Sequence, residues 1–393
     1  MKSLKKIIAL LVVAVLVMTT LVACGNTDKK DEGNADATTF KIGGIGPTTG
    51  GAAVYGLAVK QGAELAVKEI NAAGGINGFQ IEFQMEDDEH DAEKSVNAYN
   101  SLKDWGMQIL MGTVTSAPCT AVAAKTYEDK IFQLTPSGSA VECIQYDNAF
   151  RVCYSDPNQG AASAQYIAEN KLAEKVAVIY NSQDVYSTGI YESFAQGAKA
   201  QKLEIVAAEA FTNDSATDFS VQLQKAKDAG ADMVFLPIYY EAASLILTQA
   251  DGMEYAPKFF GCDGMDGILS MKGFDTKLAE GLMLLTPFAA DAQDDLTKNF
   301  VTAYEEAYKS TPIQFAADAY DAIYILKAAM EKADVKPSMS AGDICSALQK
   351  AIVEIEFTGL TTAGKTMTWE SNGEPNKAPM AVVIKDGVYT SMQ

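Results

Sequence analysis

The strongest constraint on the fold of this 393-residue chain is an alternation of short apolar runs with amphipathic helical segments. Residues 40–45 predict a strand, and Ala58, Leu65 and Ile70 then share one face of a helix that stops at Gly74. Further strands are expected at 81–85, 109–111 and 131–134, with helices at 92–105 and 117–128. Such an alternation predicts a parallel sheet with helices on both faces.

The alternation starts again after Pro157, which predicts a second lobe of the same kind. Strands are expected at 176–180, 205–206, 233–236, 259–260 and 282–285, with helices near 188–200, 219–229 and 242–250. A longer helical stretch, 296–330, is broken at Pro312, and residues 365–369 and 380–384 are strand-like. The expected fold class is α/β, with two doubly wound parallel-sheet lobes. Open parallel sheets bind ligands at the carboxyl ends of their strands, so we expect the site in the cleft between the lobes.

The first 23 residues are predicted to be an export signal peptide. Three early lysines precede an unbroken apolar run at 7–18. The alternative, a transmembrane anchor, is disfavoured because a span needs roughly 20 apolar residues. The motif Leu-Val-Ala-Cys that ends at Cys24 resembles the bacterial lipobox, which implies cleavage before Cys24 and lipidation of its sulfur. The polar stretch 24–39 is expected to be a lipidated flexible tether.

The chain is expected to cross between the lobes three times, near 155–158, near 287 and near 359–364. The predicted first lobe therefore combines residues 40–156 with 288–360, and the predicted second lobe combines 157–287 with 361–393. Lobes joined in this way form a hinge. A ligand that contacts both lobes only in the closed form shifts the population toward closure.

The charge and the rare residue types exclude several function classes. The formal net charge is −20, from 51 acidic and 31 basic side chains, and such a chain repels the phosphate backbone of a nucleic acid. The single histidine, His90, excludes a histidine-cluster metal site, and no metal or other cofactor is predicted. His90 lies in a run of acidic residues, which we interpret as a solvated helix start.

The catalytic motifs G-x-S-x-G and H-E-x-x-H do not occur, so the chain is not predicted to be an enzyme. Carboxylates are abundant, and an extracellular hydrolase with an acidic pair therefore remains the enzymatic alternative.

Two glycine-rich segments imitate nucleotide-binding motifs. In residues 44–50 the third glycine comes one residue late and Pro47 lacks an amide, so we interpret them as a strand-to-helix turn. Residues 359–366 fit the P-loop pattern letter for letter. A working P-loop opens a helix, whereas the residues after Thr366 are strand-like, so we interpret this segment as a turn between the lobes.

The cysteines that follow Cys24 match no metal-binding spacing; they are Cys119, Cys143, Cys153, Cys262 and Cys345. Outside the cytoplasm a disulfide is allowed, and Cys143 and Cys153 flank a turn-rich stretch. They are the pair that the sequence favours. The alternative, in which all thiols are free, stays open.

Polar side chains follow the strands of both lobes at the ends that face the expected cleft. Ser116 follows the third strand and begins a helix, where amides and a hydroxyl bind anions. Residues 135–139 follow the next strand with the same geometry. In the second lobe the strand ends carry Tyr186, Tyr239 and Asp263. One lobe therefore supplies hydroxyls, and the other supplies tyrosines and a carboxylate.

Several of these segments carry a resemblance to a known family: residues 42–50, 62–66, 69–78, 112–116, 135–137, 150–151, 156–160 and 186–189. The chain resembles the type I periplasmic binding proteins of the branched-chain amino acid (Leu/Ile/Val) family, the extracellular receptors of ABC importers. The resemblance runs from about Phe40 to the C-terminus.

The resemblance implies a role for each polar residue. The Ser116 hydroxyl would bind the α-carboxylate of an amino acid, helped by amides near Ser139. The backbone of Ser137 and Gly138 and the hydroxyl of Ser139 would accept from the α-ammonium, and Asp263 would be its charge partner. A zwitterion needs a hydroxyl-and-amide cradle at one end and a carboxylate at the other.

Three aromatic residues complete the implied site. Tyr186 and Tyr239 would close from the second lobe, and Tyr55 would pack on the ligand side chain. The chain departs from the best-known members of the family: Asp263 is shorter than their glutamate, Ser139 stands where threonine is usual, and the early cysteine of their disulfide is absent. The first two departures leave the side-chain preference open, and the third leaves the disulfide pattern open.

The function that the resemblance implies is capture of a ligand without chemistry. The chain is expected to be a monomeric lipoprotein on the outer face of the cell membrane that closes on leucine, isoleucine or valine and delivers it to an ABC permease. The alternative within the same fold is another small polar ligand, such as an amide or a polar or aromatic amino acid. Unless the single arginine, Arg151, reaches the ligand carboxylate, hydroxyls and amides must hold it.

Overall fold

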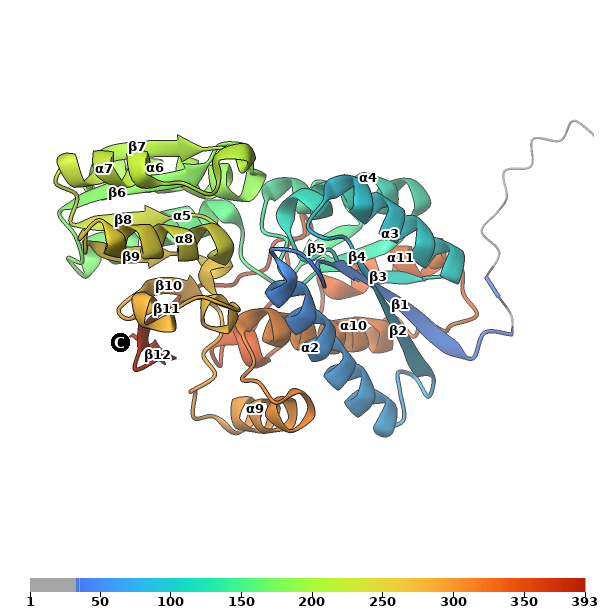
Figure 1. The fold of residues 1–393 in the computed structure, drawn as a ribbon. Coiled ribbons are helices and arrows are strands. Elements are labelled where there is room, and N and C mark those ends of the chain that lie inside the picture. Colours follow the sequence, from blue (N-terminus) through green and yellow to red (C-terminus); the bar gives the residue numbers. More distant parts are fainter. Residues whose placement is uncertain (1–32, 35, 393) are drawn as a thin grey trace, which may run out of the picture.

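Two lobes lie side by side in the structure (Figure 1). This computed structural model describes residues 33, 34 and 36–392. The predicted signal peptide, Cys24 and most of the predicted tether lie outside the described residues. Within them, no helix is both long enough and apolar enough to cross a membrane.

The first lobe is built on five parallel strands in the order β2-β1-β3-β4-β5. Their bounds are β1 Thr39–Gly46, β2 Gln80–Asp87, β3 Ile109–Gly112, β4 Phe132–Thr135 and β5 Ala149–Arg151. All residues of β3, β4 and β5 are buried, because helices cover the parallel sheet on both faces.

Five helices cover this sheet: α2 Ala53–Ala72, α3 Ala92–Trp105, α4 Ser116–Asp129, α10 Gln314–Lys332 and α11 Ala341–Ile352. Apolar residues of α2, α10 and α11 share one core with Ile42 and Met111, whereas α3 and α4 pack with Ile45 and Leu110 on the opposite face. Helices α2 and α10 approach closely at Gly62, where a Cβ atom would lie 2.1 Å from the carbonyl oxygen of Ala316. Glycine at this position therefore sets the spacing of the two helices.

The second lobe has seven strands in the order β12-β11-β10-β9-β8-β6-β7. Their bounds are β6 Lys175–Asn181, β7 Glu204–Phe211, β8 Met233–Leu236, β9 Lys258–Gly261, β10 Met283–Thr286, β11 Met380–Lys385 and β12 Val388–Ser391. The first five of these are parallel, and β11 and β12 add an antiparallel edge.

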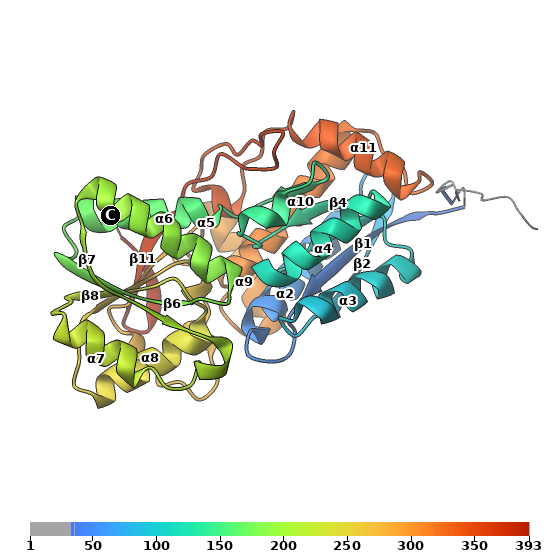
Figure 2. The ribbon, with the colours of Figure 1, turned by 90° about the horizontal axis from the view of Figure 1, so that it is seen from above.

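Four helices cover the second sheet: α5 Asp156–Glu169, α6 Val185–Gln201, α7 Ser220–Asp228 and α8 Tyr240–Gly252. Helices α5 and α6 pack on one face and α7 and α8 on the other (Figure 2). Helix α9, Asp295–Tyr308, follows β10. The predicted fold class, two α/β lobes on parallel sheets, is confirmed.

The chain passes between the lobes after β5, after β10 and before β11. The last crossing lies further along the chain than the sequence suggested. The Trp369 indole donates to the carbonyl oxygen of Arg151 at 2.8 Å, and the Arg151 amide donates to that of Gly373 at 3.2 Å. Residues up to Gly373 thus pack against the first lobe, and the predicted boundary at 361 is corrected to the stretch between Gly373 and Met380.

Most predicted elements appear within a few residues of their expected positions, and the break at Pro312 separates α9 from α10. The strand expected at 365–369 is wrong, because Met367 and Trp369 form isolated bridges and no continuous ladder. Helices α5 and α11 and strands β5 and β12 were not predicted.

The P-loop-like segment does not open an α-helix. A short 3-10 turn at Leu360–Thr362 takes that place. The carboxylate of Asp321 accepts hydrogen bonds from the amides of Leu360 and Thr361, at 3.0 and 2.8 Å, and from the Thr361 hydroxyl. A carboxylate of the chain itself therefore binds the amides that a phosphate would need. The segment is a turn, as predicted, but it lies within the first lobe and not between the lobes.

Candidate ligand-binding cleft

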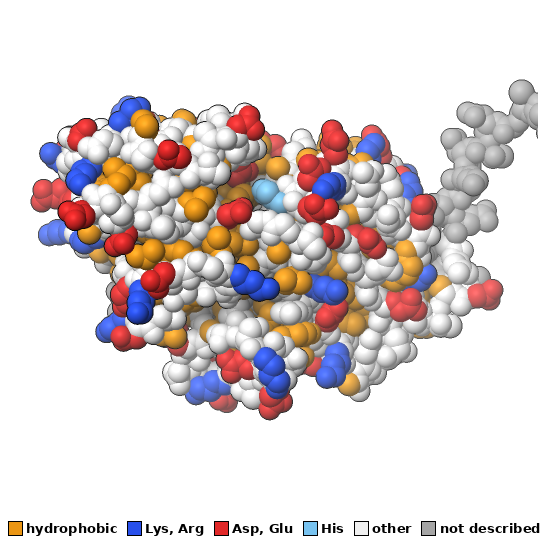
Figure 3. Space-filling view, in the orientation of Figure 1, with side chains coloured by type: hydrophobic (Ala, Val, Ile, Leu, Met, Phe, Trp, Pro, Cys, Tyr) orange, Lys and Arg blue, Asp and Glu red, His pale blue; other side chains and the backbone are white. Residues whose placement is uncertain are grey.

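The polar strand ends of the two sheets meet where the lobes face each other. Ser116, Ser137 and Ser139 come from the first lobe, and Tyr186 and Asp263 come from the second; each is at most 6% exposed. In the space-filling view the lobes touch along a narrow boundary (Figure 3). The structure thus brings the predicted site residues together in a closed cleft.

The serines of the first lobe form a cradle at the start of α4. Ser116 is the first residue of that helix. Its hydroxyl accepts hydrogen bonds from the amides of Ser139 and Ala140, both at 3.2 Å, and lies 3.5 Å from the Ser139 hydroxyl. Ser137 instead donates its hydroxyl to the carbonyl oxygen of Val114 at 2.7 Å. A helix N-terminus lined with hydroxyls and amides favours a carboxylate.

Arg151 supports this cradle from behind and does not enter the cleft. Its buried guanidinium donates to the carbonyl oxygens of Gly138, Ser139 and Ala140, at 3.3 Å for Gly138 and 3.0 Å for Ala140. Its Nε atom lies 3.5 Å from the carboxylate of Glu374. Because these groups occupy the guanidinium, a bound carboxylate would meet hydroxyls and amides.

Asp263 follows β9 and is held in place by the second lobe. One of its oxygens accepts from the Tyr186 hydroxyl at 2.8 Å, its amide donates to Gln159 at 3.1 Å, and the Gly264 amide donates to Tyr186 at 2.9 Å. Burial raises the pKa of Asp263 to about 7, although hydrogen bonds from Tyr186 and Gln159 lower it. A bound ammonium would stabilise the ionised carboxylate.

Asp156 is a second buried carboxylate that the sequence analysis did not assign to the site. It begins α5, and neither of its carboxylate oxygens has a hydrogen-bond partner among the described residues. Burial raises its pKa well above the ordinary value, and the charge of Asp263 raises it further. Two neighbouring carboxylates with raised pKa values favour a cationic group beside them.

Tyr55 ties the two lobes together. Its hydroxyl donates to the carbonyl oxygen of Gly264 and accepts from the Tyr240 amide at 3.1 Å. Its ring packs on Phe315, with centroids 4.3 Å apart, and on Tyr239 at 5.8 Å. The Tyr55 ring therefore forms an aromatic wall with Phe315 and Tyr239. Its hydroxyl makes two hydrogen bonds between the lobes, which we call the latch.

Two further contacts complete the closed arrangement. Tyr239 stacks on Tyr186 with ring centroids 4.6 Å apart and nearly parallel planes. Gln314, at the start of α10, donates its side-chain amide to the carbonyl oxygen of Asp263 at 3.0 Å and its backbone amide to Asp266 at 2.7 Å. Gln314 was missed because its contacts lie about 50 residues away along the chain.

The interpretation of His90 as part of a solvated helix start is half correct: the residue lies directly before the Asp91 cap of α3, but its ring is partly buried against other residues. Its ring nitrogen lies 2.8 Å from the Thr115 hydroxyl, and its ring meets that of Tyr239 edge-on at 5.2 Å. Burial lowers the pKa of His90, so the ring is neutral at pH 7. A left-handed turn at Glu89 and His90 directs the ring toward Thr115 and Tyr239, and Asp91 caps the helix that follows. Sequence periodicity does not show such a turn.

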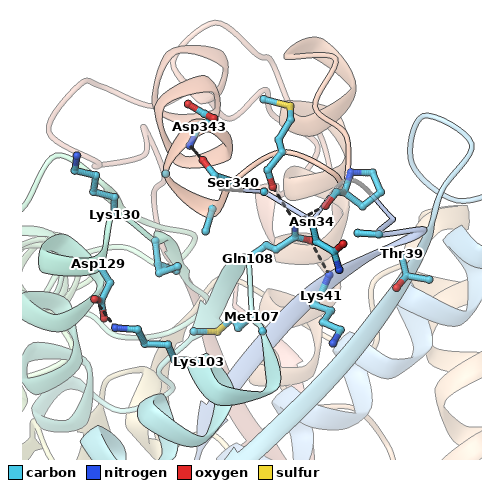
Figure 4. A pocket seen from close by; sticks show the side chains of 18 of the residues that line it. Asn34, Thr39, Lys41, Lys103, Met107, Gln108, Asp129, Lys130, Ser340 and Asp343 are labelled. Carbon is cyan, nitrogen blue, oxygen red and sulfur yellow. Dashed lines mark hydrogen bonds and ion pairs between the residues drawn. The ribbon is translucent and has the colours of Figure 1, made fainter. Parts of the chain in front are cut away.

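His90 also lines a cavity of about 250 Å³ between the lobes, together with Asp184 and Tyr239. A larger hollow, of about 1650 Å³, lies at the other end of the first lobe, where the N-terminal segment joins β1 (Figure 4). Lys41, Gln108 and Ser340 line it. It lies at the amino ends of the strands and is not part of the cleft. Within the described residues no group of three acidic, histidine or cysteine side chains is placed to hold a metal ion.

The five cysteines that the structure describes are all free and buried. The Cys143–Cys153 disulfide that the sequence favoured is not formed. Cys143 packs with Cys119 and Ala140 instead, because the turn after Ala140 points it toward α4.

Residues 39–387 match the periplasmic binding protein family. The chain belongs to this family. Its members act outside the cytoplasm, and the relatives found here are solute-binding proteins and not enzymes. The predicted family and fold are therefore confirmed.

Several similar proteins carry names of amino-acid binders. The leucine-, isoleucine-, valine-, threonine- and alanine-binding protein of Pseudomonas aeruginosa is 30% identical over 76% of this chain and 79% of its own length. The branched-chain substrate-binding protein LivJ of Streptococcus pneumoniae, solved with isoleucine, superposes with a TM-score of 0.81 at 28% identity and covers 90% of this chain and 98% of its own. The leucine-binding protein LivK of Thermotoga maritima gives 0.79 at 26% identity, with the same coverage.

Proposed function

We propose that this periplasmic binding protein captures leucine, isoleucine or valine and delivers it to the permease of an ABC importer. The observation that carries the proposal is one closed cleft with an anion cradle at Ser116 and a buried carboxylate at Asp263. These two groups match the two charged ends of an amino-acid zwitterion. The names and the bound isoleucine of the similar proteins support the same ligand class.

The ligand side chain would lie against an aromatic wall. Tyr55, Phe315 and Tyr239 pack on one another beside the cradle. An apolar wall favours a branched aliphatic side chain because burying each methylene contributes about 0.8 kcal/mol. The charged ends would then fix the orientation and the wall would select the side chain.

Capture works by closure of the hinge, and no bond is made or broken. The ligand contacts both lobes in the closed form only, so its binding energy shifts the protein toward that form. The permease would recognise the closed form. The proposal includes a monomer held at the outer face of the membrane through a lipid on Cys24.

A ligand panel tests the proposal. Each amino acid is added to the purified protein at 100 times its expected dissociation constant, where a true ligand stabilises by roughly 2.7 kcal/mol. Leucine, isoleucine and valine should raise the melting temperature, whereas isocaproate, which lacks the ammonium, and isoamylamine, which lacks the carboxylate, should not. A panel in which an amide or an aromatic amino acid raises it and all three branched-chain amino acids leave it unchanged would overturn the ligand assignment.

A matched pair of variants tests the role of Asp263. Asp263→Asn keeps the shape of the side chain but removes the charge, so leucine binding should be lost. Asp228→Asn changes an exposed carboxylate on α7 of the same lobe and should leave leucine binding unchanged. Full affinity in Asp263→Asn would show that the ammonium has another partner.

A further inference from the structure

Cys119 and Cys143 lie together beneath the serine cradle. Cys119 belongs to α4 and Cys143 to the 3-10 turn Val141–Ile144, and both side chains are completely buried. With Ala140 they form a small apolar cluster of their own, separate from the main cores. We infer that Cys119 and Cys143 are joined by a disulfide in the exported protein.

The surroundings of the two sulfurs support a cross-link. The Sγ of Cys143 lies 3.7 Å from the carbonyl oxygen of Ser116, one helical turn before Cys119. The Gln133 side chain donates to the Sγ of Cys119 at 3.3 Å. Gly138 leaves the space that Cys119 fills, since a Cβ atom at Gly138 would lie 2.9 Å from that sulfur. The thiols are thus fixed side by side by the loop and the helix that carry them.

The folded surroundings shift the acidity of the two thiols in opposite directions. Burial raises the pKa of Cys119, but hydrogen bonds from Cys143, Thr113 and Thr135 outweigh it and bring the pKa to about 7. Burial raises the pKa of Cys143 well above the ordinary value. The interaction between the two thiols is further evidence that their sulfurs lie within reach of each other in the folded protein.

The reaction balances with an external protein disulfide as the oxidant. The thiolate of one of the two cysteines attacks one sulfur of that disulfide and forms a mixed disulfide, and the other oxidant sulfur leaves as a thiolate. The thiol of the other cysteine then loses its proton, and its thiolate attacks the sulfur of the first cysteine, which forms the Cys119–Cys143 bond and releases the second oxidant sulfur as a thiolate. Cys119 and Cys143 together lose two electrons and two protons, and the oxidant becomes a dithiol. Because both sulfurs are buried in the folded protein, exchange precedes the packing of this segment, in a compartment where disulfides persist.

Such a bond would tie together the two halves of the cradle. Cys119 lies one turn after Ser116, and Cys143 lies three residues after Ala140, whose amide donates to the Ser116 hydroxyl. The inference does not depend on the identity of the ligand. It needs only the location outside the cytoplasm that the family has.

Cys153 is the competing partner of Cys143 by sequence distance. It lies beyond Arg151 and is not part of the small cluster that Cys143 forms with Cys119 and Ala140. The structure therefore favours Cys119 over Cys153.

Peptide mapping distinguishes the pairs. The exported protein is isolated without reductant, alkylated in denaturant and cut with trypsin, which separates the three cysteines into residues 104–125, 131–151 and 152–171. The expected product joins 104–125 to 131–151 and is two hydrogen atoms lighter than the sum of the two peptides. Alkylated, unlinked peptides, or a link between 131–151 and 152–171, would overturn the inference.

Thermal unfolding gives a second readout. Reduction of the wild-type protein should lower the melting temperature by about 4–5 °C, since opening the cross-link frees a loop of about 25 residues in the unfolded chain. Cys143→Ala should not respond to reductant, whereas Cys153→Ala, which removes another buried thiol, should keep the full response. A wild-type melting temperature that is insensitive to reductant contradicts the inference even if a variant fails to fold.

Discussion

The buried guanidinium of Arg151 offers the sharpest test of how the anion cradle is built. It donates to three successive carbonyl oxygens, those of Gly138, Ser139 and Ala140, and contacts Glu374. Arg151→Met removes these donors and leaves the buried oxygens without partners. Breaking a buried charged contact in this way costs about 3–5 kcal/mol, since each hydrogen bond to a charged group contributes about 1.5–3 kcal/mol.

The measurement is urea unfolding of the ligand-free protein combined with calorimetric titration of the ligand. We expect Arg151→Met to lose about 3–5 kcal/mol of unfolding free energy and at least about tenfold in affinity, because the amides of Ser139 and Ala140 would no longer be aimed at Ser116. Arg151→Lys should lose part of both, since an ammonium cannot match the planar guanidinium fork. Glu374→Gln is the matched control, because it keeps the three carbonyl contacts. Equal stability and affinity in Arg151→Met and Glu374→Gln would refute this account of the cradle.

Three further predictions concern the latch, the charge partner and the anchor. Tyr55→Phe keeps the ring but removes two contacts between the lobes, so ligand affinity should fall by about 5- to 30-fold, measured by calorimetry; an unchanged affinity would contradict the latch. Burial raises the pKa of Asp263 from 3.8 to about 7. The protonated form stabilises the empty closed cleft, and this stability is lost as the pH rises from 3.8 to about 7. Ligand affinity should rise over the same range, by up to about tenfold per pH unit, because the ligand ammonium then meets an ionised carboxylate. Titrations across this pH range should show this slope in the wild type, and the same slope in Asp263→Asn would exclude Asp263 as its source. Cys24→Ala should abolish incorporation of labelled fatty acid and release the protein from membranes; labelled Cys24→Ala would place the lipid elsewhere.

Local patterns predicted the fold well where elements are long and periodic. The helix at 53–72 and the break at Pro312 follow from apolar spacing and from the missing amide of proline. Helix α5 escaped prediction because its buried face is made mostly of small and polar residues, with Ile167 its one large apolar side chain. Residues 365–369 have strand-like composition but no neighbouring strand to pair with, so they do not form a strand.

The candidate site was predictable only in its strand-end residues. Ser116 and Asp263 follow buried strands of parallel sheets. The carboxyl ends of parallel strands lie at the same edge of their sheet, so the position of these residues can be predicted without knowing the rest of the fold. The support from Arg151 and the position of His90 depend on contacts between segments that are distant in sequence or on a left-handed turn. The cysteine pairing failed for a related reason, since Cys153 is nearer to Cys143 in sequence and Cys119 is its neighbour in space.

The closed cleft explains why closure should await a ligand. The contacts of Tyr55 and Gln314 between the lobes favour closure, but in the closed form the carboxylates of Asp156 and Asp263 are both buried, and the charge of Asp263 raises the pKa of Asp156. Burying an ionised carboxylate without a cation is costly, so the empty closed form must either take up a proton or reopen. A ligand ammonium removes that cost while its carboxylate occupies the cradle. The two acids would therefore make the closed state depend on a bound cation, and a variant that neutralises both should close without one.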